Sequence, residues 1–409
     1  MNKVTVRDID VGFKRVLVRV DFNIPLDAET GAITDFSRIE AALPTIKYLV
    51  YRGAKVILAS HLGRPKGKVV DNLRLTVVAR RLSQILGQHV IVTKDCIGLE
   101  AEKAVETMQS GDVLLLENLR FHSDEEAGSA LFAQALSHLG DIYVNDAFGT
   151  SHRAHASIVR MAEYLPAVAG LLLEKELKTL GGILENPDRP FMALLGGAKI
   201  NDKVGMLENI LGKVDSILIG GGMAATFLKA KSYEIGQSLI ETDRLDTAVR
   251  LINKATRNGV QLLLPVDVVV ADGVGIDAGV EVVAMGNIPP DKMVVDIGPQ
   301  TISNFSEELR RCKVVFWNGP MGICEVSKFA GGTHAMARLV ANLNATTIIG
   351  GGSTAEVVTE MKLTDKMTFV STGGGASLKF LSGETLPGVD VLWDKENSCS
   401  GQFSVNKGD

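Results

Sequence analysis

The sequence predicts an α/β protein with two domains, each a parallel sheet covered by helices on both faces, joined by a hinge helix. Three observations lead to this fold class. Short runs of Val, Ile and Leu alternate with helical patterns along the chain. These runs show little alternation with polar residues, which is typical of parallel strands buried on both faces. At 409 residues the chain also exceeds one ordinary hydrophobic core.

The first half of the chain alternates regularly between strands and helices. Apolar runs predict strands at residues 15–21, 55–60, 90–94, 113–119 and 141–147. Apolar residues at helical spacing predict helices at 37–51, 75–86, 99–108 and 125–139. Because parallel strands share one carboxyl edge, the polar residues that follow them are expected to meet there.

A hinge is predicted near residue 170. One continuous helix is expected over 166–184, followed by the turn-rich link 185–190. We place a first domain at 1–170, a second at 171–388 and a C-terminal segment at 389–409. The polar end of that segment, 396–409, is expected to be disordered.

The second half repeats the alternation, with glycines after the strands. Strands are predicted at 191–195, 216–219, 262–270, 293–297, 314–317, 346–349 and 367–370. Four of them run into glycine turns, at 196–197, 220–222, 350–352 and 373–375. Glycine permits close backbone approach, so N–H groups in such turns can line an anion. Four turns on one sheet edge indicate a nucleoside polyphosphate site.

Two lysines accompany the first of these turns. After the strand 191–195, apolar spacing predicts a helix, with Asn201 and Asp202 as its caps. Lys199 is expected in the turn and Lys203 in the first helical turn, where both can reach one bound phosphate.

Basic residues mark the strand ends of the first half. These are Arg38, Arg64, Arg120 and Arg153, together with His61 and His152. Any one of these arginines could form an ordinary surface salt bridge. Convergence of all four at one edge predicts instead a site for a small, strongly anionic ligand.

Composition narrows the class of protein. The net charge of −5 argues against general nucleic-acid binding. No apolar run reaches membrane-spanning length, and the N-terminal sequence lacks a signal-peptide apolar segment, so we expect a cytoplasmic protein. The four cysteines are scattered, which predicts neither a disulfide framework nor a zinc cluster.

The glycine turns are compatible with several nucleotide chemistries. A P-loop is absent, since residues 63–69 lack both its spacing and its hydroxyl. Two turns, 220–225 and 350–355, match the glycine pattern of nicotinamide-dependent dehydrogenases, but no acidic residue ends the following strand. A non-catalytic phosphate-binding module leaves the arginines unexplained. Two ligands on two hinged halves favour phosphoryl transfer, in which closure excludes water.

Eight motifs resemble the signatures of the phosphoglycerate kinase family, in the same order, over about residues 4–395. They are RVDFNIP (19–25), SHLGRP (60–65), ENLRF (117–121), HRAH (152–155), GAKINDK (197–203), GGGMA (220–224), WNGPMG (317–322) and TGGGA (372–376). The resemblance implies a monomeric glycolytic enzyme of two Rossmann-like domains. It would pass a phosphoryl group between 1,3-bisphosphoglycerate and MgADP, giving 3-phosphoglycerate and MgATP.

The resemblance also implies the roles of individual residues. The phosphoglycerate would be held by Asp21, Asn23, Arg38, His61, Gly63, Arg64, Arg120, His152 and Arg153. The nucleotide would be held by Gly197, Ala198, Lys203, Gly221, Asn318, Glu325, Gly351, Gly352, Ser353 and Thr354. The transferring phosphoryl group would meet Arg38, Lys199, Gly373, Gly374 and Gly375. No nucleic acid, membrane or protein partner is implied.

Three features depart from the family pattern. Ser353 stands where the family usually has an aspartate that helps to hold Mg²⁺, so the serine would be a weak metal ligand, with Asp202 and Glu356 as alternatives. Cys324 replaces a usual phenylalanine beside Glu325, which we interpret as a repacked pocket wall. The tail 396–409 continues past the usual end of the family.

Overall fold

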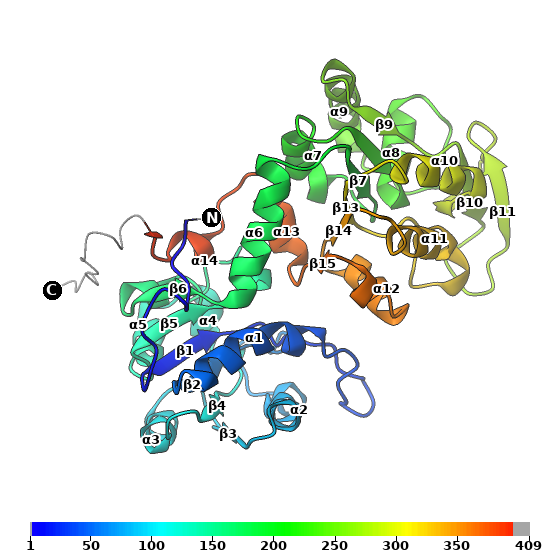
Figure 1. Cartoon of the computed structure of the whole chain (residues 1–409). Coiled ribbons are helices and arrows are strands. Elements are labelled where there is room, and N and C mark those ends of the chain that lie inside the picture. Colours follow the sequence, from blue (N-terminus) through cyan, green and yellow to red (C-terminus); the bar gives the residue numbers. More distant parts are fainter. Residues whose placement is uncertain (1, 396–409) are drawn as a thin grey trace. The chain divides into compact units, whose positions relative to one another are not determined.

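The structure is a computed structural model that describes residues 2–395 (Figure 1). The tail 396–409 and its expected disorder lie outside the described residues. The chain forms two compact units, and the boundary between them falls inside helix α6 (Leu171–Glu185). Of the described residues, the first unit comprises 2–178 and 385–395, and the second is Thr179–Glu384.

This division differs from the expected one at both ends of the second unit. The second unit was expected to begin at residue 171, where α6 begins. The first turns of α6, up to Lys178, belong instead to the first unit. The C-terminal segment returns to the first unit, where Asn145 Nδ2 donates to Gly388 O at 2.7 Å and Trp393 N donates to Ala167 O at 3.0 Å.

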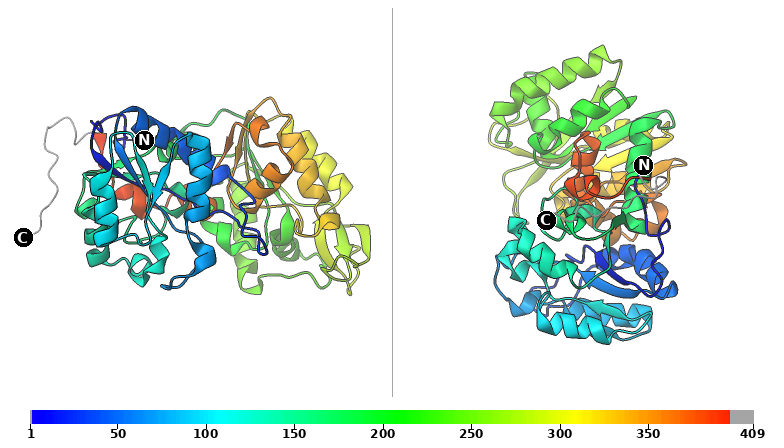
Figure 2. Two further views of the ribbon diagram at one scale, coloured as in Figure 1. Left: turned by 90° about the horizontal axis from the view of Figure 1, so that it is seen from below. Right: turned by 90° about the vertical axis from the view of Figure 1, so that its left-hand side faces the viewer.

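A six-stranded parallel sheet forms the centre of the first unit, in the order β3-β4-β2-β1-β5-β6. Its strands are β1 (Arg15–Arg19), β2 (Lys55–Ala59), β3 (Val90–Val92), β4 (Val113–Leu115), β5 (Ile142–Asn145) and β6 (Ala167–Ala169). The five strands predicted for this half are therefore confirmed as parallel neighbours. Helices lie on both sides of the sheet (Figure 2).

The helices of this unit largely follow the sequence pattern. They are α1 (Ser37–Tyr51), α2 (Thr76–Leu86), α3 (Leu99–Thr107), α4 (Ser123–Ala127), α5 (Ala130–Ser137) and α14 (Pro387–Asp390). Short 3₁₀ helices lie at Asp71–Leu73, Leu119–Phe121, Phe148–Thr150 and Arg160–Glu163. The single helix expected at 125–139 is wrong, because Gly128 adopts φ +67° and ends α4. Ser129 then caps α5 by accepting from Phe132 N at 3.4 Å.

The continuous helix expected over 166–184 is also wrong at its start. Residues Ala167–Ala169 pair with β5 as the sixth strand, and the helix begins only at Leu171. The reason is a tertiary cap, since Asp146 Oδ1 accepts from Leu172 N at 2.9 Å and from Leu173 N at 3.1 Å. Burial raises the pKa of Asp146 to about 7. A capping residue so distant in sequence is invisible to local pattern reading.

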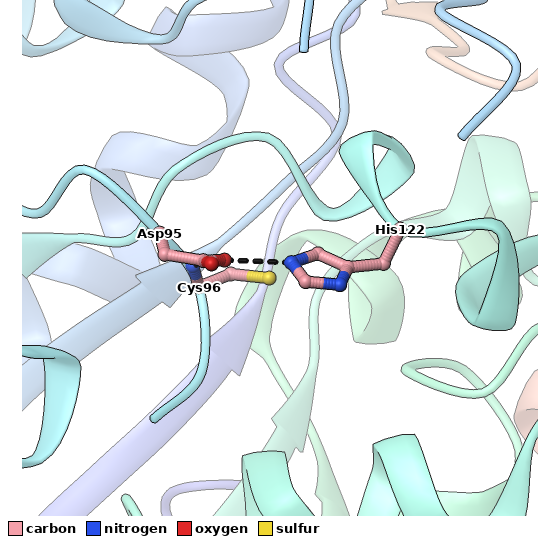
Figure 3. A group of neighbouring side chains, drawn as sticks. All are labelled: Asp95, Cys96 and His122. Carbon is pink, nitrogen blue, oxygen red and sulfur yellow. Dashed lines mark hydrogen bonds and ion pairs between the residues drawn. The ribbon is translucent and has the colours of Figure 1, made fainter. Parts of the chain in front are cut away.

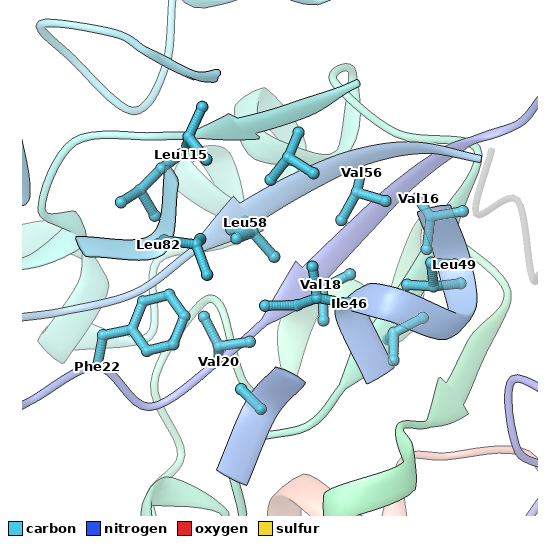
Figure 4. Close-up of a cluster of buried hydrophobic side chains, with 14 of the residues drawn as sticks. Val16, Val18, Val20, Phe22, Ile46, Leu49, Val56, Leu58, Leu82 and Leu115 are labelled. Carbon is cyan, nitrogen blue, oxygen red and sulfur yellow. The ribbon is translucent and has the colours of Figure 1, made fainter. Parts of the chain in front are cut away.

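A large hydrophobic core of the first unit lies between the sheet and helices α1 and α2. Val16, Val18 and Val20 project from β1 and its extension onto Ile46 and Leu49 of α1 (Figure 4). Leu17 lies between them in sequence and is 2% exposed, so β1 is buried on its other face as well. Burial on both faces is why this strand reads as an uninterrupted apolar run.

A second six-stranded parallel sheet organises the second unit, in the order β15-β14-β13-β7-β8-β9. Its strands are β7 (Phe191–Leu195), β8 (Ser216–Ile219), β9 (Gln261–Leu263), β13 (Val314–Asn318), β14 (Thr346–Ile349) and β15 (Phe369–Val370). Its helices are α7 (Val204–Ile210), α8 (Gly221–Ala230), α9 (Leu245–Arg257), α10 (Pro299–Leu309), α11 (Gly331–Val340), α12 (Ser353–Glu360) and α13 (Gly374–Leu381). Short 3₁₀ helices occur at Asn201–Lys203, Thr242–Arg244, Ser327–Phe329 and Thr364–Lys366.

The second unit also contains a small antiparallel sheet that the sequence pattern does not predict. It consists of β10 (Asp267–Ala271), β11 (Val280–Ala284) and β12 (Met293–Ile297) in the order β11-β10-β12. The strand expected at 262–270 is wrong, because it divides at Pro265, which has no N–H for a ladder. The strand at 293–297 exists, but it pairs antiparallel with β10. Within residues 2–395, no helix combines the length and apolar character needed to cross a bilayer.

Candidate active site

The carboxyl edge of the first sheet collects the polar residues that the sequence placed there. Asp21 and Asn23 follow β1, and His61, Gly63 and Arg64 follow β2. Arg120 follows β4, whereas His152 and Arg153 follow β5. Arg38 lies in the first turn of α1. Since all six strands are parallel, one edge carries the whole set.

Hydrogen bonds hold several of these side chains in place before any ligand binds. Arg38 forms an ion pair with Asp21. Asn23 Oδ1 accepts from Gly63 N at 2.8 Å, and Arg120 Nη1 donates to Gly63 O at 2.8 Å. Gly63 adopts φ +65°, and a Cβ there would lie 2.7 Å from Leu73. The loop after β2 therefore requires glycine, and it links Asn23 to Arg120.

This edge carries a strong positive potential. Burial, followed by the charges of Arg19, Arg120, Arg153 and Arg38, holds the pKa of His61 well below its usual range. Burial, and then the charges of Arg120, Arg153 and Arg19, lower the pKa of His155 to about 4. Two neutral imidazoles among four guanidiniums form a site suited to an anion rather than a cation.

The guanidinium of Arg120 has a donor that could bind such an anion. Its Nη2 is buried and has no hydrogen-bond partner within the described residues. Burial lowers the pKa of Arg120, so desolvation of the guanidinium has a cost. A phosphate or carboxylate oxygen is the kind of acceptor that would offset this cost.

The other predicted residues of this edge are more open. Arg64 is exposed, and His152 and Arg153 are half-buried. Arg153 Nε donates to His152 Nε2 at 3.4 Å. Arg19 and His155 were not among the predicted site residues, although both lie within the quoted motifs 19–25 and 152–155. The polar residues of those motifs were the signal that could have found them.

A group elsewhere on the first unit has side chains of metal-ligating types. Asp95, Cys96 and His122 place one ligand atom each within 4.8 Å of one another (Figure 3). His122 Nε2 and Asp95 Oδ1 already share a hydrogen bond of 2.7 Å, and Asp95 Oδ1 also accepts from Cys96 N at 2.6 Å. Burial, then Asp95, raises the pKa of the Cys96 thiol well above its ordinary value, which disfavours the thiolate that a metal needs. We interpret the group as a link between two loops.

The glycine turns of the second unit lie at one sheet edge, as the sequence predicts. Gly196 follows β7, Gly220 follows β8, Gly350 follows β14 and Gly373 lies beyond β15. Asn318, the last residue of β13, is buried between β14 and β7 in the sheet order. A Cβ on Gly350 would lie 2.5 Å from Asn318 Nδ2, so this turn packs directly on that side chain.

The first two turns use their glycines for packing rather than for anion binding through N–H groups. Gly197 N donates to Pro320 O at 2.8 Å, and Gly221 N donates to Met321 O at 2.9 Å. A Cβ on Gly319 would lie 2.2 Å from Gly196 O, and one on Gly221 would lie 2.5 Å from Gly197 N. For Gly197 and Gly221, the expectation that free N–H groups line an anion is wrong, because backbone carbonyls already occupy them.

The first backbone N–H groups of α12 donate to no backbone carbonyl among residues 2–395. The first N–H groups of a helix have no partner within it, and here they belong to Ser353 and its neighbours. Gly352 adopts φ +80° with open space around its Cβ position. Thr354 is buried and its Oγ1 accepts from Gly319 N at 2.6 Å, so its side chain fixes α12 against the turn after β13. This helix start suits a phosphate better than the earlier turns do.

The turn after β15 lies close to the turn after β14. A Cβ on Gly351 would lie 2.8 Å from Gly374 N. Gly373 is buried, Gly374 is half-buried and Gly375 is exposed. Bulkier residues at these positions would separate the two turns, so glycine keeps the backbone of both accessible at one point.

The two lysines differ in their surroundings. Lys203 is 7% exposed, its Nζ lies 3.1 Å from the Cβ position of Gly197, and burial lowers its pKa. Lys199 is exposed and forms no hydrogen bond or ion pair with the described residues. The expected caps are wrong, since α7 begins after Lys203 with no side-chain cap. Glu241 Oε2 instead accepts from Ile200 N at 2.6 Å.

The remaining predicted residues lie in open positions. Ala198 and Glu325 are exposed, and Cys324 is half-buried. The pKa of Cys324 is raised to about 11 by burial and then by the charge of Glu325. Ser353 is half-buried, whereas Asp202 and Glu356 are exposed.

The two sheets carry different chemical groups. One edge presents a cationic cluster, and the other presents lysines, glycine turns and a helix start. Together they define a two-domain α/β phosphotransferase. The family model "Phosphoglycerate kinase" matches residues 6–384, so the chain belongs to the phosphoglycerate kinase family.

Relatives support this assignment over nearly the whole chain. The chain is 54% identical over 395 residues to the phosphoglycerate kinase of Pelotomaculum thermopropionicum, covering 97% of this chain and 100% of that protein. It is 54% identical over 390 residues to that of Dictyoglomus turgidum, covering 95% and 98%. The enzyme is thus a kinase with a carboxyl group as acceptor, and the dehydrogenase interpretation is set aside.

Solved structures confirm the predicted fold class. The phosphoglycerate kinase of Coxiella burnetii superimposes with a TM-score of 0.83 at 39% identity, covering 95% of this chain and 98% of that one. That of Pyrococcus horikoshii gives a TM-score of 0.85 at 31% identity, covering 98% and 100%.

Proposed function

We propose that the enzyme transfers a phosphoryl group between 1,3-bisphosphoglycerate and MgADP, giving 3-phosphoglycerate and MgATP, as a cytoplasmic monomer. In this proposal the first unit binds the phosphoglycerate and the second binds the nucleotide. The observation that carries it is the cluster of Arg19, Arg38, Arg120 and Arg153 around His61, whose pKa burial and then these four charges hold well below its usual range. A strongly anionic small molecule is the ligand that such a cluster fits.

The assigned residues have distinct tasks in this proposal. Arg38, Arg64, Arg120 and Arg153 neutralise the phosphate and carboxylate of the phosphoglycerate, while Asn23 and Gly63 shape the loop around it. Lys203 and the start of α12 bind the nucleotide phosphates. Gly197 and Gly221 contribute by leaving room for close approach. Ala198, Asn318 and Glu325 complete the nucleotide site.

The chemistry consists of positioning and charge neutralisation. We assign Arg38 and Lys199, with the turn Gly373–Gly375, to the phosphoryl group as it crosses. The acceptor is a carboxylate, whose reference pKa near 4 leaves it ionised at neutral pH. No general base is therefore required.

A direct assay tests this function. The protein is incubated with MgATP, 3-phosphoglycerate and hydroxylamine, which traps an acyl phosphate as a hydroxamate. We expect hydroxamate to accumulate with time, and none to form when 3-phosphoglycerate is omitted. Absence of hydroxamate from the complete mixture would contradict the proposed reaction.

Mg²⁺ fits this site only weakly. Ser353 offers one neutral hydroxyl at the positive end of α12, and hard divalent cations prefer carboxylates. Two exposed carboxylates lie close by in the sequence: Asp202 directly precedes Lys203, and Glu356 follows Ser353 in α12. Mg²⁺ would therefore be held chiefly by the nucleotide's own phosphate oxygens, and its chemistry when bound is to neutralise their charge.

Ser353→Asp is expected to tighten binding of MgADP, because a carboxylate is a better ligand for Mg²⁺ than a hydroxyl. Calorimetric titration of MgADP into both proteins measures the change. Ser353→Asn, which has a similar size to aspartate but no charge, is the matched control and should bind like the parent. Equal or weaker binding by Ser353→Asp would mean that another group already holds the metal.

We also propose that α6 acts as a hinge and that the units close only when both ligands are bound. The support is that the cationic cluster and the lysine-bearing turn belong to different compact units. Small-angle scattering should give a smaller radius of gyration with 3-phosphoglycerate and a non-hydrolysable MgATP analogue together than with either alone. An unchanged radius with both would contradict the hinge.

A further inference from the structure

We infer that Arg19 is a positioning residue for His61: it holds His61 in the neutral tautomer whose proton lies on Nε2. His61 then offers the phosphoglycerate a hydrogen-bond donor rather than a positive charge. This inference rests on the proposed function of the first unit, and it assigns a role to an arginine outside the set predicted from the sequence.

The geometry of the pair determines which nitrogen carries the proton. Both side chains are buried, with Arg19 1% and His61 2% exposed. Arg19 Nη2 lies 3.2 Å from His61 Nδ1. A guanidinium has donors and no acceptor, so Nδ1 must supply a lone pair. In a neutral imidazole with an unprotonated Nδ1, the proton is on Nε2.

Arg19 is itself held in one orientation. Its Nε donates to Ser157 Oγ at 2.9 Å, and its Nη1 donates to Val20 O. Ser157 Oγ in turn donates to Glu125 Oε1 at 2.6 Å, and Ser157 N donates to Glu125 Oε2 at 2.9 Å. Glu125 is fully buried, so it supplies a counter-charge linked to Arg19 through one hydroxyl. This chain leaves the guanidinium little freedom to turn away from His61.

The charges around His61 favour its neutral form. Burial lowers its pKa most, and the guanidiniums of Arg19, Arg120, Arg153 and Arg38, from four different segments, lower it further. Within residues 2–395, Asp21 is the one carboxylate that forms an ion pair with the ring, with Oδ1 3.9 Å from Nδ1. Asp21 is already paired with Arg38, and Arg19 lies closer to Nδ1. Asp21 is therefore poorly placed to stabilise a protonated imidazole.

A neutral donor has a clear consequence for binding. The arginines already supply the charge, so a charged imidazole would add repulsion within the free site. A fixed Nε2–H adds one directional hydrogen bond to an oxygen of the ligand. The contribution of His61 to affinity should then stay constant across the neutral pH range.

Nitrogen NMR on the ligand-free protein tests the tautomer. The protein is labelled with ¹⁵N-histidine, and His61→Ala identifies the His61 signals. We expect an unprotonated Nδ1 and a protonated Nε2, unchanged from pH 6 to pH 8, a range centred near the ordinary histidine pKa of about 6.5. A proton on Nδ1, or titration of the ring within this range, would overturn the inference.

Variants of Arg19 test the positioning role. Arg19→Met removes the donor and should raise the KM for 3-phosphoglycerate about tenfold or more, in line with loss of an oriented hydrogen bond to a charged group. It should also allow the His61 signals to show both tautomers. Arg19→Lys retains a donor and should restore the Nε2–H signals and part of the affinity. Arg15→Met, at the other end of β1, is the control and should leave both measurements unchanged.

The outcomes separate this inference from the proposed function. If the parent protein turns over 3-phosphoglycerate but Arg19→Met keeps the Nε2–H tautomer and a normal KM, Arg19 does not position His61. If the parent forms no hydroxamate, the proposed function fails, while the NMR result still reports the tautomer. Thermal unfolding shows whether Arg19→Met folds, and Arg19→Lys provides the test if it does not.

Discussion

Lys199→Ala is expected to lower kcat by about a hundredfold or more and to leave the KM for the nucleotide close to the parent value. Lys199 lies in an exposed turn after β7 and makes no hydrogen bond or ion pair with the described residues. Its ammonium is therefore available to the phosphoryl group as charge develops during transfer. An interaction made only in the transition state affects turnover rather than ground-state binding.

Lys203→Ala should behave differently. Lys203 is buried beside Gly197, where it can contact a nucleotide phosphate both before and during transfer. Loss of such uniform binding raises KM with little effect on kcat. Lys366→Ala, an exposed lysine in the 3₁₀ helix Thr364–Lys366, is the matched control for charge. Steady-state kinetics with varied MgATP distinguish the three variants, and a near-normal kcat for Lys199→Ala would make Lys199 a ground-state phosphate clamp.

Arg38→Ala is expected to lower kcat by a similar factor and, in addition, to raise the KM for 3-phosphoglycerate. Arg38 would contact both the phosphoglycerate and the transferring group. Its removal also deprives Asp21 of an ion-pair partner, which leaves a buried carboxylate beside an anionic substrate. The repulsion from this unpaired charge adds to the lost contact.

Two further variants sharpen the interpretation of Arg38. Arg38→Lys keeps the charge but lacks the planar fork, so it should recover substrate binding more than turnover. Arg80→Ala, an exposed arginine of α2, should have parent kinetics and controls for general loss of charge. If Arg38→Ala retains normal kcat with only a higher KM, Arg38 belongs to the phosphoglycerate site alone.

The strand pattern was readable from the chain because buried parallel strands have a simple signature. β1 and β2 are buried on both faces, and polar residues gather where they end, with Arg19 and Asp21 after the apolar run of β1 and Ser60 and His61 after β2. Since all parallel strands share one carboxyl edge, the residue order alone placed Arg38, Arg120 and Arg153 in one region. The same reasoning located the glycine turns after β7, β8, β14 and β15.

Local patterns failed where a distant residue decides the structure. Helix α6 begins late because Asp146, from the end of β5, caps its first turn. The turn before α7 is held by Glu241 rather than by Asn201 or Asp202. The strand β11 is exposed and pairs antiparallel with β10, and its short sequence VEVVA is interrupted by Glu281, unlike the continuous apolar runs of the buried strands.

Residue types and their order along the chain were sufficient to indicate the fold class and to place the polar residues and the glycine turns at the carboxyl edges of the two sheets. The tertiary structure alone decided how those residues can act. In the folded protein, the N–H groups of Gly197 and Gly221 donate to carbonyl oxygens of the turn after β13. Folding also surrounds His61 with arginines from four segments and places Arg19 Nη2 within hydrogen-bond distance of its Nδ1. The reason is that hydrogen-bond occupancy and protonation depend on atoms a few ångströms apart in space, which separations in sequence do not specify.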